Sequence, residues 1–277
     1  MHIAGADIFH DQPGTDGPAI VLVHGGMCDH HDWDRMLPSL AAKHTVVRLD
    51  LRGHGRSTGD AADCTVEHWA ADVLALIAAL GLAPAILVGH SLASRIVAEA
   101  AVQNPGAVAG LVLLDGSRGH GGKAAAPASI PQPAPDLAAI IELTIGPYAD
   151  AAARKAIAAT MASTSPAIMA ACVSAMREWD LGRADAVFAA LAGALPVLAI
   201  QSTYHDPATA RHSFERSDQT SPYLDFLGET VPQLEVATFT RTGHFSMVEK
   251  PEATAQLIVA LASRAASHQP ITDGGKI

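Results

Sequence analysis

The chain has few aromatic, charged or cysteine residues. Of its 277 residues, 4% are aromatic, 17% are charged and three are cysteine. The cysteines, Cys28, Cys64 and Cys172, are widely spaced and form no CxxC pair, which argues against a disulfide framework and against a cysteine zinc site. We therefore expect a protein of a reducing compartment, located in the cytoplasm.

Basic residues are also scarce. The 18 Lys and Arg residues stand against 28 Asp and Glu, for a net charge of −10. Nucleic-acid binding needs a clustered cationic surface, so no nucleic-acid partner is expected. No apolar run approaches the roughly 18 to 20 residues of a membrane span, and the N-terminal MHIAGADIFH lacks the pattern of a secretory leader. We expect no membrane partner.

Apolar residues, by contrast, make up 49% of the chain, enough to bury a large core. In the first half, short β-rich apolar runs alternate with amphipathic runs of helical period. This alternation is typical of a mostly parallel sheet with helices on both faces. The predicted strands are Ala19–Val23, Thr45–Leu49, Ala85–Val88, Leu111–Leu114, Pro196–Ile200 and Leu234–Thr240, and the predicted helices are Thr65–Leu80, Ser91–Gln103 and Pro251–Ala265.

The pattern changes after Asp115. Gly116–Pro135 is rich in Gly and Pro, and Pro135–Leu191 is Ala-rich with a helical pattern throughout. The sequence thus predicts an α/β fold whose core comprises residues 1–115 and 192–277, with residues 116–191 as an inserted helical layer. The tail after residue 266 is expected to fray.

The strongest chemical signal is the run Gly89-His90-Ser91-Leu92-Ala93, between a predicted strand and a predicted helix. A serine on such a sharp turn projects its hydroxyl out of the sheet, with the helix N-terminus behind a developing oxyanion. The small residues Gly89 and Ala93 let the backbone turn without a clash. The alternative interpretation is that Ser91 only caps the helix.

Three further motifs follow other predicted strands. His24-Gly25-Gly26 could offer backbone N–H groups to the same anion, DLRGHGRS occupies residues 50–57, and Gly243-His244-Phe245 follows the last strand. In this order the motifs resemble those of the α/β-hydrolase family over nearly the whole chain. The resemblance implies that residues 116–191 form a helical cap over the site, and that no cofactor or metal is needed.

The resemblance also implies roles for individual residues. A serine hydroxyl needs a base and a carboxylate that orients the base. Ser91 would be the nucleophile and His244 the base, and the backbone N–H groups of Gly26 and Leu92 would form the oxyanion hole. Family branches that use an aspartate at this turn, the haloalkane dehalogenases and epoxide hydrolases, are excluded by Ser91.

Two residues compete for the role of the acid. Asp115 ends the strand before the inserted layer, where some relatives carry their acid, and it is the slightly favoured candidate. Asp206 is the alternative, because it falls one residue late of the position after the strand Pro196–Ile200 where the family most often places its acid.

Other residues near these motifs were weighed for supporting roles. Met27, Trp33 and His90 are candidates for the substrate pocket, although packing explains Trp33 better. His30 and His31, beside Asp29, are expected to be solvated or to face a helix end rather than to bind a metal.

A serine nucleophile points to an acyl-enzyme. The sequence therefore predicts a serine hydrolase that cleaves a small-molecule carboxylic ester or lactone. One alternative is a hydrolase of C–C bonds in ring-cleavage products, which would need cationic groups near the site. A second is a ligand-binding protein that keeps the fold without turnover. An apolar edge of the inserted layer could support a homodimer.

Overall fold

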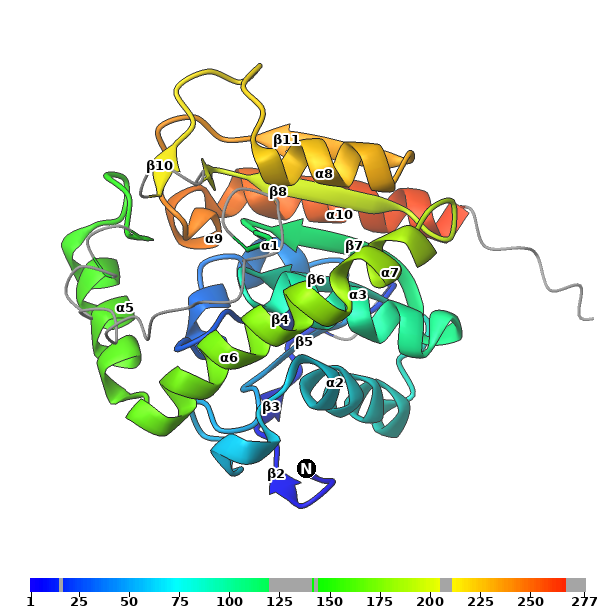
Figure 1. The fold of residues 1–277 in the computed structure, drawn as a ribbon, viewed down its shortest axis with the longest axis vertical. Coiled ribbons are helices and arrows are strands. Elements are labelled where there is room, and N and C mark those ends of the chain that lie inside the picture. Colours follow the sequence, from blue (N-terminus) through cyan, green and yellow to red (C-terminus); the bar gives the residue numbers. More distant parts are fainter. Residues whose placement is uncertain (15–16, 120–140, 142–143, 205–210, 268–277) are drawn as a thin grey trace, which may run out of the picture.

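A computed structural model of the chain describes residues 1–14, 17–119, 141, 144–204 and 211–267 (Figure 1). In this part of the chain the main sheet has seven strands, in the order β11-β8-β7-β6-β4-β5-β3. All neighbours pair in parallel except β3 and β5, which are antiparallel. The strands are β3 (His10–Asp11), β4 (Ile20–Val23), β5 (Val46–Leu49), β6 (Ala85–His90), β7 (Val108–Leu114), β8 (Val197–Gln201) and β11 (Leu234–Thr238).

The six predicted strands are all present, with ends that differ by a few residues. The central four read IVLV, AILVGH, VAGLVLL and VLAIQ and are buried on both faces, as expected for parallel strands between helical layers. The short strands were not predicted, because two residues carry no periodicity. They are β3 and the two small ribbons formed by β1 (His2–Ile3) with β2 (Ala6–Asp7) and by β9 (Thr203–Tyr204) with β10 (His212–Ser213).

Helices cover both faces of the sheet. The helices α2 (Val66–Leu80) and α3 (Ala93–Gln103) belong to the apolar cluster on one face, and α1 (Leu37–Ala41) and α10 (Pro251–Ser267) to the cluster on the other. Thr65 caps α2 by accepting from the His68 N–H at 3.2 Å, and Gly81 ends it with φ of 66°. Both ends of this helix match the prediction.

Three helices, α5 (Ala151–Ser163), α6 (Pro166–Gly182) and α7 (Ala184–Ala190), lie between β7 and β8 in the chain. In Figure 1, α6 crosses in front of the central strands and α3. It is tied to α3 by a two-bond ion pair of Arg95 with Asp180, at 2.7 Å each, and by the Trp179 indole N–H donated to Glu99 at 2.9 Å. The inserted layer is thus fastened to the helix that follows Ser91.

The remaining elements of the described residues are short. They are α8 (Pro222–Thr230), α9 (Ser246–Glu249) and the 3₁₀ turns at His30–Trp33, Ala61–Asp63 and Pro105–Ala107. Within the described ranges no single helix is long and apolar enough to cross a membrane. The pair of α5 and α6, bent by 93°, meets that test of length and composition when taken together.

Candidate active site

Ser91 lies on a sharp turn between β6 and α3. Its φ is 54°, in the left-handed region that disfavours residues with a side chain, and its N–H donates to the Leu114 carbonyl at 2.8 Å. A Cβ on Gly89 would lie 2.2 Å from the Ala93 carbonyl oxygen, so the turn requires glycine there. The strained backbone and the tight crossing present Ser91 at the carboxyl end of the sheet, as the sequence predicted.

The His24-Gly25-Gly26 loop passes directly against this turn. A Cβ on Gly25 would come within 2.9 Å of His90 Nδ1 and 3.2 Å of the Ser91 Cβ, so only glycine lets the two loops approach so closely. A Cβ on Gly26 would lie 3.4 Å from the side chain of Leu92, the residue after Ser91. The next residue, Met27, has φ of 62°. The two residues predicted to supply oxyanion N–H groups, Gly26 and Leu92, are thus neighbours.

His244 is buried at the same edge of the sheet. Its N–H donates to the Thr144 carbonyl at 2.8 Å, and its own carbonyl accepts from His90 Nε2 at 2.8 Å. The two imidazole centroids lie 4.7 Å apart. Because Nε2 of His90 must carry the proton it donates, and burial lowers the pKa of His90 to about 4, this ring is neutral and supports the His244 backbone. At 1% exposure, His90 lies beneath the site rather than lining it.

Glu249 holds the loop that carries His244. Its two carboxylate oxygens accept from the N–H groups of Gly146, Tyr148 and Gly243 at 3.1–3.2 Å. Gly146 and Gly243 approach so closely that a Cβ on Gly146 would meet the Gly243 nitrogen at 2.2 Å. The stretch of the inserted segment just before α5 is therefore locked to the residue before His244. No pattern in the sequence indicated this role of Glu249.

Asp115 is buried, with φ of 48°, and both its oxygens are bound by the loop after β8. Oδ1 accepts from the N–H groups of Ser202 and Thr203 at 2.8 and 3.0 Å, and Oδ2 accepts from the Ser202 hydroxyl at 2.6 Å. The Thr203 hydroxyl lies 3.4 Å from both Asp115 Oδ1 and His244 Nδ1. Burial raises the pKa of Asp115 to about 6, against the lowering effect of these hydrogen bonds. Asp206, the other candidate acid, lies outside the described residues.

Arg211 also reaches His244. Its Nη1 donates to the Thr203 hydroxyl at 2.9 Å and lies 3.0 Å from His244 Nδ1. A guanidinium only donates hydrogen bonds, so in this contact Nδ1 accepts and the ring proton is on Nε2. A histidine that deprotonates a serine needs the opposite tautomer, in which Nε2 is free to accept the serine proton and Nδ1–H is donated to a carboxylate. For His244 to act as a base, Arg211 has to leave Nδ1.

The model that describes the alpha/beta hydrolase family matches residues 20–257, most of the chain. Together with the order of the strands and the serine turn, this match decides the family. The chain belongs to the alpha/beta hydrolase family.

Curated relatives of this hydrolase match it over shorter stretches. It is 37% identical over 107 residues to a fluoroacetate dehalogenase of Burkholderia sp, over 37% of this chain and 35% of the relative. It is 38% identical over 102 residues to a probable esterase of Oryza sativa subsp. japonica, over 35% of this chain and 38% of the relative. The matches thus span about a third of the relatives' own length.

Solved structures match the hydrolase almost from end to end. An esterase of Rhodococcus sp. ECU1013, RhEst1, covers 94% of this chain and 96% of its own, with a TM-score of 0.74 and 25% identity. Est816, described as an N-acyl homoserine lactone degrading enzyme, covers 94% of this chain and 98% of its own, with a TM-score of 0.71 and 21% identity. The second likeness, at lower identity, concerns the fold alone.

The DLRGHGRS segment serves the architecture of the hydrolase. Asp50 accepts from the N–H and the Nδ1 of His30 and from the Arg56 N–H at 2.7–2.8 Å, and Arg52 forms a two-bond ion pair with Asp72. His30 is therefore buried rather than solvated, and of the two positions expected for it only the one at a helix end remains, since it begins the 3₁₀ turn His30–Trp33. The sequence did not indicate this burial, because the carboxylate that binds His30 belongs to Asp50, 20 residues later in the chain.

His24 links the loops after β4 and β5. Its Nδ1 donates to the Gly25 carbonyl at 2.7 Å, and its Nε2 accepts the Leu51 N–H at 3.0 Å, an arrangement that only the neutral ring can make. Burial and the neighbouring His54 lower the pKa of His24 to about 3.

The buried, neutral state of His24 predicts that its contribution to the free energy of unfolding depends on pH. Unfolded, His24 takes up a proton below a pKa of about 6.5, whereas folded it stays neutral down to about 3. Its contribution is therefore complete above pH 6.5 and is lost as the pH falls. We expect the stability advantage of the wild type over His24→Gln to shrink by about 1.4 kcal/mol per pH unit between pH 6 and 4. Urea unfolding of both proteins across this range measures it, and a constant difference would contradict it.

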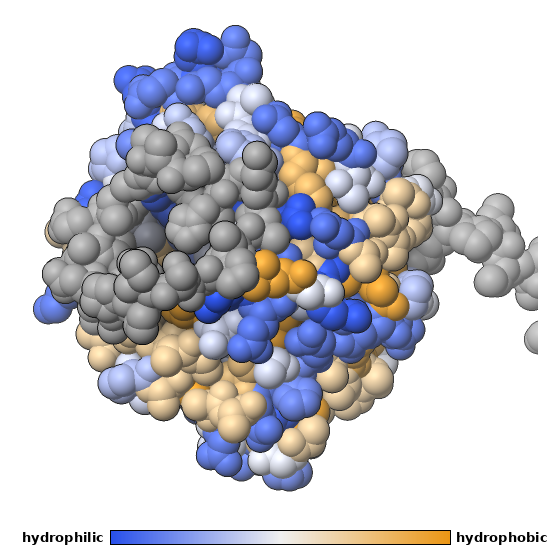
Figure 2. Space-filling view, in the orientation of Figure 1, coloured by the Kyte–Doolittle hydropathy of each residue, from blue (hydrophilic) through white to orange (hydrophobic). Residues whose placement is uncertain are grey.

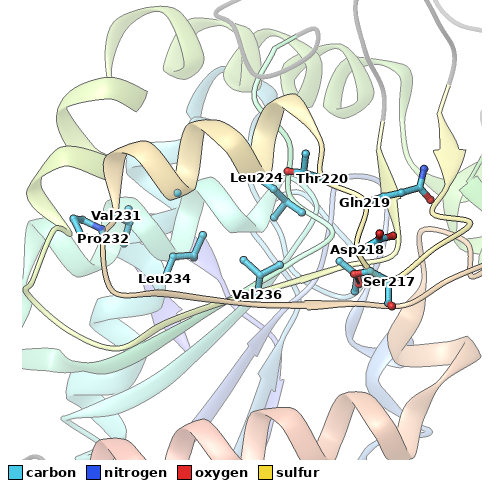
Figure 3. A pocket seen from close by; sticks show the side chains of 11 residues that line it. Ser217, Asp218, Gln219, Thr220, Leu224, Val231, Pro232, Leu234 and Val236 are labelled. Atoms are coloured by element: carbon cyan, nitrogen blue, oxygen red, sulfur yellow. Dashed lines mark hydrogen bonds between the residues drawn. The ribbon is translucent and has the colours of Figure 1, made fainter.

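Two of the predicted pocket residues take different positions. Trp33 is fully buried in the cluster with Met36 and Phe245, so it packs the core, whereas Met27 is partly exposed beside Gly26. The groove in Figure 3 lies elsewhere, between β11, α8 and the loop before α8. Its lining contains none of the candidate catalytic residues.

One cluster has ligand types suited to a metal. Among the described residues, single ligand atoms of Cys28, Asp32 and His90 lie within 4.8 Å of one another, and all three residues are buried. Burial raises the pKa of Asp32 to about 7 and that of Cys28 well above its usual value, so both groups favour their protonated forms. Metal ligands must be deprotonated, and this cluster is better suited to hold protons.

Proposed function

We propose that this protein is a serine hydrolase that cleaves carboxylic esters or lactones through an acyl-enzyme. The observation that carries the proposal is the contact of two strained loops. Ser91 has φ of 54°, and Gly25 approaches it so closely that a Cβ there would lie 2.9 Å from His90 Nδ1 and 3.2 Å from the Ser91 Cβ. Strain of this kind costs about 1–3 kcal/mol and is typical of functional sites. A helix N-cap alone needs neither the strain nor the second loop.

The reaction follows from these positions. Ser91 Oγ attacks the carbonyl carbon while His244 Nε2 takes its proton, and the N–H groups of Gly26 and Leu92 receive the oxyanion. Collapse expels the alcohol, which takes the proton back from His244, and leaves Ser91 acylated. Water, deprotonated by His244, then releases the acid. In a lactone the alcohol and the acid remain one molecule.

For the acid we propose Asp206 rather than Asp115. Both oxygens of Asp115 already accept hydrogen bonds from Ser202 and Thr203, and its described route to His244 Nδ1 passes through the Thr203 hydroxyl. We assign Asp115 the task of fixing the loop after β8. In the sequence, Asp206 comes three residues after Thr203.

Residues 116–191 act in this proposal as a cap over the site. A Cβ built on Gly26 would lie 3.5–3.6 Å from the side chain of the α6 residue Cys172, whose sulfur lies 3.4 Å from His54 Nε2. Burial raises the pKa of Cys172 to about 12, so it packs as a neutral thiol. The cap thus packs directly on the oxyanion loop and shapes the space above it.

A fluorophosphonate probe tests the proposal. We expect one equivalent to react, with the added mass on the peptide that contains Ser91, and we expect multiple turnovers of short 4-nitrophenyl esters by unlabelled protein. Labelling without turnover would favour the ligand-binding alternative. A ring-fission product, assayed alongside, tests the C–C hydrolase alternative, which Arg211 favours as a cation beside the site.

A further inference from the structure

Two guanidinium groups border the turn that follows β7. Arg95 comes one helical turn after Ser91 on α3, and Arg211 contacts Thr203 and His244. Asp115 lies near Arg211, whose charge lowers its pKa against the raising effect of burial, and a Cβ on Gly116 would lie within 3.0 Å of Ser94, the residue before Arg95. Neither arginine was identified from the sequence as part of the site.

Arg95 is 2% exposed, and its hydrogen-bonding capacity is only partly used. Nε and Nη2 donate to the two oxygens of Asp180, while Nη1 has no partner within the described part of the chain. Asp180 has little capacity left, since Oδ2 also accepts the Gly119 N–H at 2.6 Å. A buried guanidinium N–H without an acceptor is costly, so this group favours an incoming anion.

Other buried polar atoms surround Gly116. A Cβ built there would lie 2.7 Å from the Tyr223 hydroxyl and 2.8 Å from Ser94 Oγ. The Tyr223 hydroxyl also lacks a partner among the described residues, and burial raises its pKa, so it stays a donor. Gln201 Nε2 donates to the Gly116 carbonyl and joins this turn to β8. Arg95 Nη1 and the Tyr223 hydroxyl are thus two buried donors without a partner among the described residues.

Arg211 supplies a second cation without a described counter-ion. Within residues 1–14, 17–119, 141, 144–204 and 211–267, no carboxylate lies within 4.0 Å of its nitrogens. Burial lowers its pKa, the nearby Asp115 carboxylate raises it, and the charge of Arg95 lowers it by a smaller amount. Arg211 donates only to Thr203 and His244 among the described residues, so an incoming carboxylate would be its first direct ion-pair partner there.

We propose that Arg211 and Arg95, with the Tyr223 hydroxyl, form a subsite for a carboxylate, so that the substrates of this hydrolase are esters that carry a carboxylate elsewhere in the molecule. The inference rests on the proposed ester hydrolysis. Guanidinium groups suit carboxylates because their N–H donors match both oxygens.

The subsite has a consequence for His244. In the described arrangement Arg211 Nη1 faces His244 Nδ1, which fixes the ring in the tautomer that cannot deprotonate Ser91. A substrate carboxylate that binds Arg211 draws the guanidinium away from Nδ1. The ring can then donate Nδ1–H to its acid and accept the Ser91 proton at Nε2. Anionic esters would therefore gain in kcat as well as in KM.

The matched pair of substrates is monomethyl glutarate, which carries one carboxylate, and dimethyl glutarate, which carries none. We expect wild-type kcat/KM to favour the monoester by at least about tenfold, and Arg211→Gln to lose most of this preference. Arg211→Lys, which keeps the charge without the fork, should restore part of it. Released acid is measured by chromatography.

Arg216→Gln is the control. Arg216 is exposed and pairs only with Asp218 among the described ion pairs. It belongs to the segment between β10 and α8. Figure 1 draws this segment at the top of the molecule, and Figure 2 shows that the surface there is mostly hydrophilic. This variant should keep the wild-type preference. Equal preference in Arg211→Gln and wild type would overturn the proposal.

Binding separates this inference from the proposed function. Titration calorimetry with glutarate needs no turnover, and 1,5-pentanediol serves as the uncharged control ligand. If neither ester is hydrolysed, ester hydrolysis fails, while glutarate binding weakened at least tenfold by Arg211→Gln still supports the subsite. Absent binding, or binding that Arg211→Gln leaves unchanged, overturns it.

Discussion

Replacing Ser91 with alanine is expected to lower kcat for 4-nitrophenyl esters by about 10⁵- to 10⁶-fold, the scale on which serine triads lose activity when the nucleophile is removed. The change deletes only Oγ. Alanine meets the same backbone strain at φ of 54°, and Ser91 is bound into the turn through its backbone N–H. We therefore expect the fold and the melting temperature to be retained.

Ser94→Ala is the matched control for this experiment. Ser94 lies three residues later, is buried, and donates its hydroxyl to the Gly89 carbonyl at 3.1 Å. Its replacement removes a hydroxyl from the same turn without removing the nucleophile, so activity should fall far less. Circular dichroism and thermal unfolding show whether both variants are folded. If folded Ser91→Ala kept a tenth of wild-type activity, the acyl-enzyme mechanism would be refuted.

The second large effect is expected for the acid. Asp206→Asn should lower kcat by about 10⁴-fold, because an amide favours the wrong tautomer of the base and no longer stabilises the imidazolium. Asp115→Asn should instead act mainly on stability. Its amide group cannot accept all the bonds that Ser202 and Thr203 now donate, and each buried donor left unpaired costs about 1–3 kcal/mol.

The two variants are therefore distinguished by which quantity changes. Steady-state kinetics at saturating substrate give kcat, and urea unfolding gives the free energy of unfolding. A folded Asp115→Asn protein with the 10⁴-fold loss, beside an active Asp206→Asn protein, would return the role of acid to Asp115. Normal kcat in both would show that another group orients His244.

The sequence predicted the sheet well because its strands are local signals. Runs such as IVLV and VAGLVLL are apolar and β-branched, and parallel strands buried on both faces select such runs wherever they pair. The turn at Ser91 was readable for the same reason, since Gly89 and Ala93 are needed by contacts within five residues. His244 was identified through the family's motif order rather than through any local property.

The sequence by itself determined the α/β fold and the sharp serine turn, because each depends on neighbours in the chain or on apolar periodicity. Only the tertiary structure decided that Asp115 binds Ser202, that Glu249 holds the His244 loop, and that Arg211 contacts His244. These groups come from segments far apart in the sequence. The sequence does not indicate which partner a charged side chain will have, because folding brings the two groups together. Once the pair is buried, removing one partner leaves an unpaired buried charge and destabilises the fold.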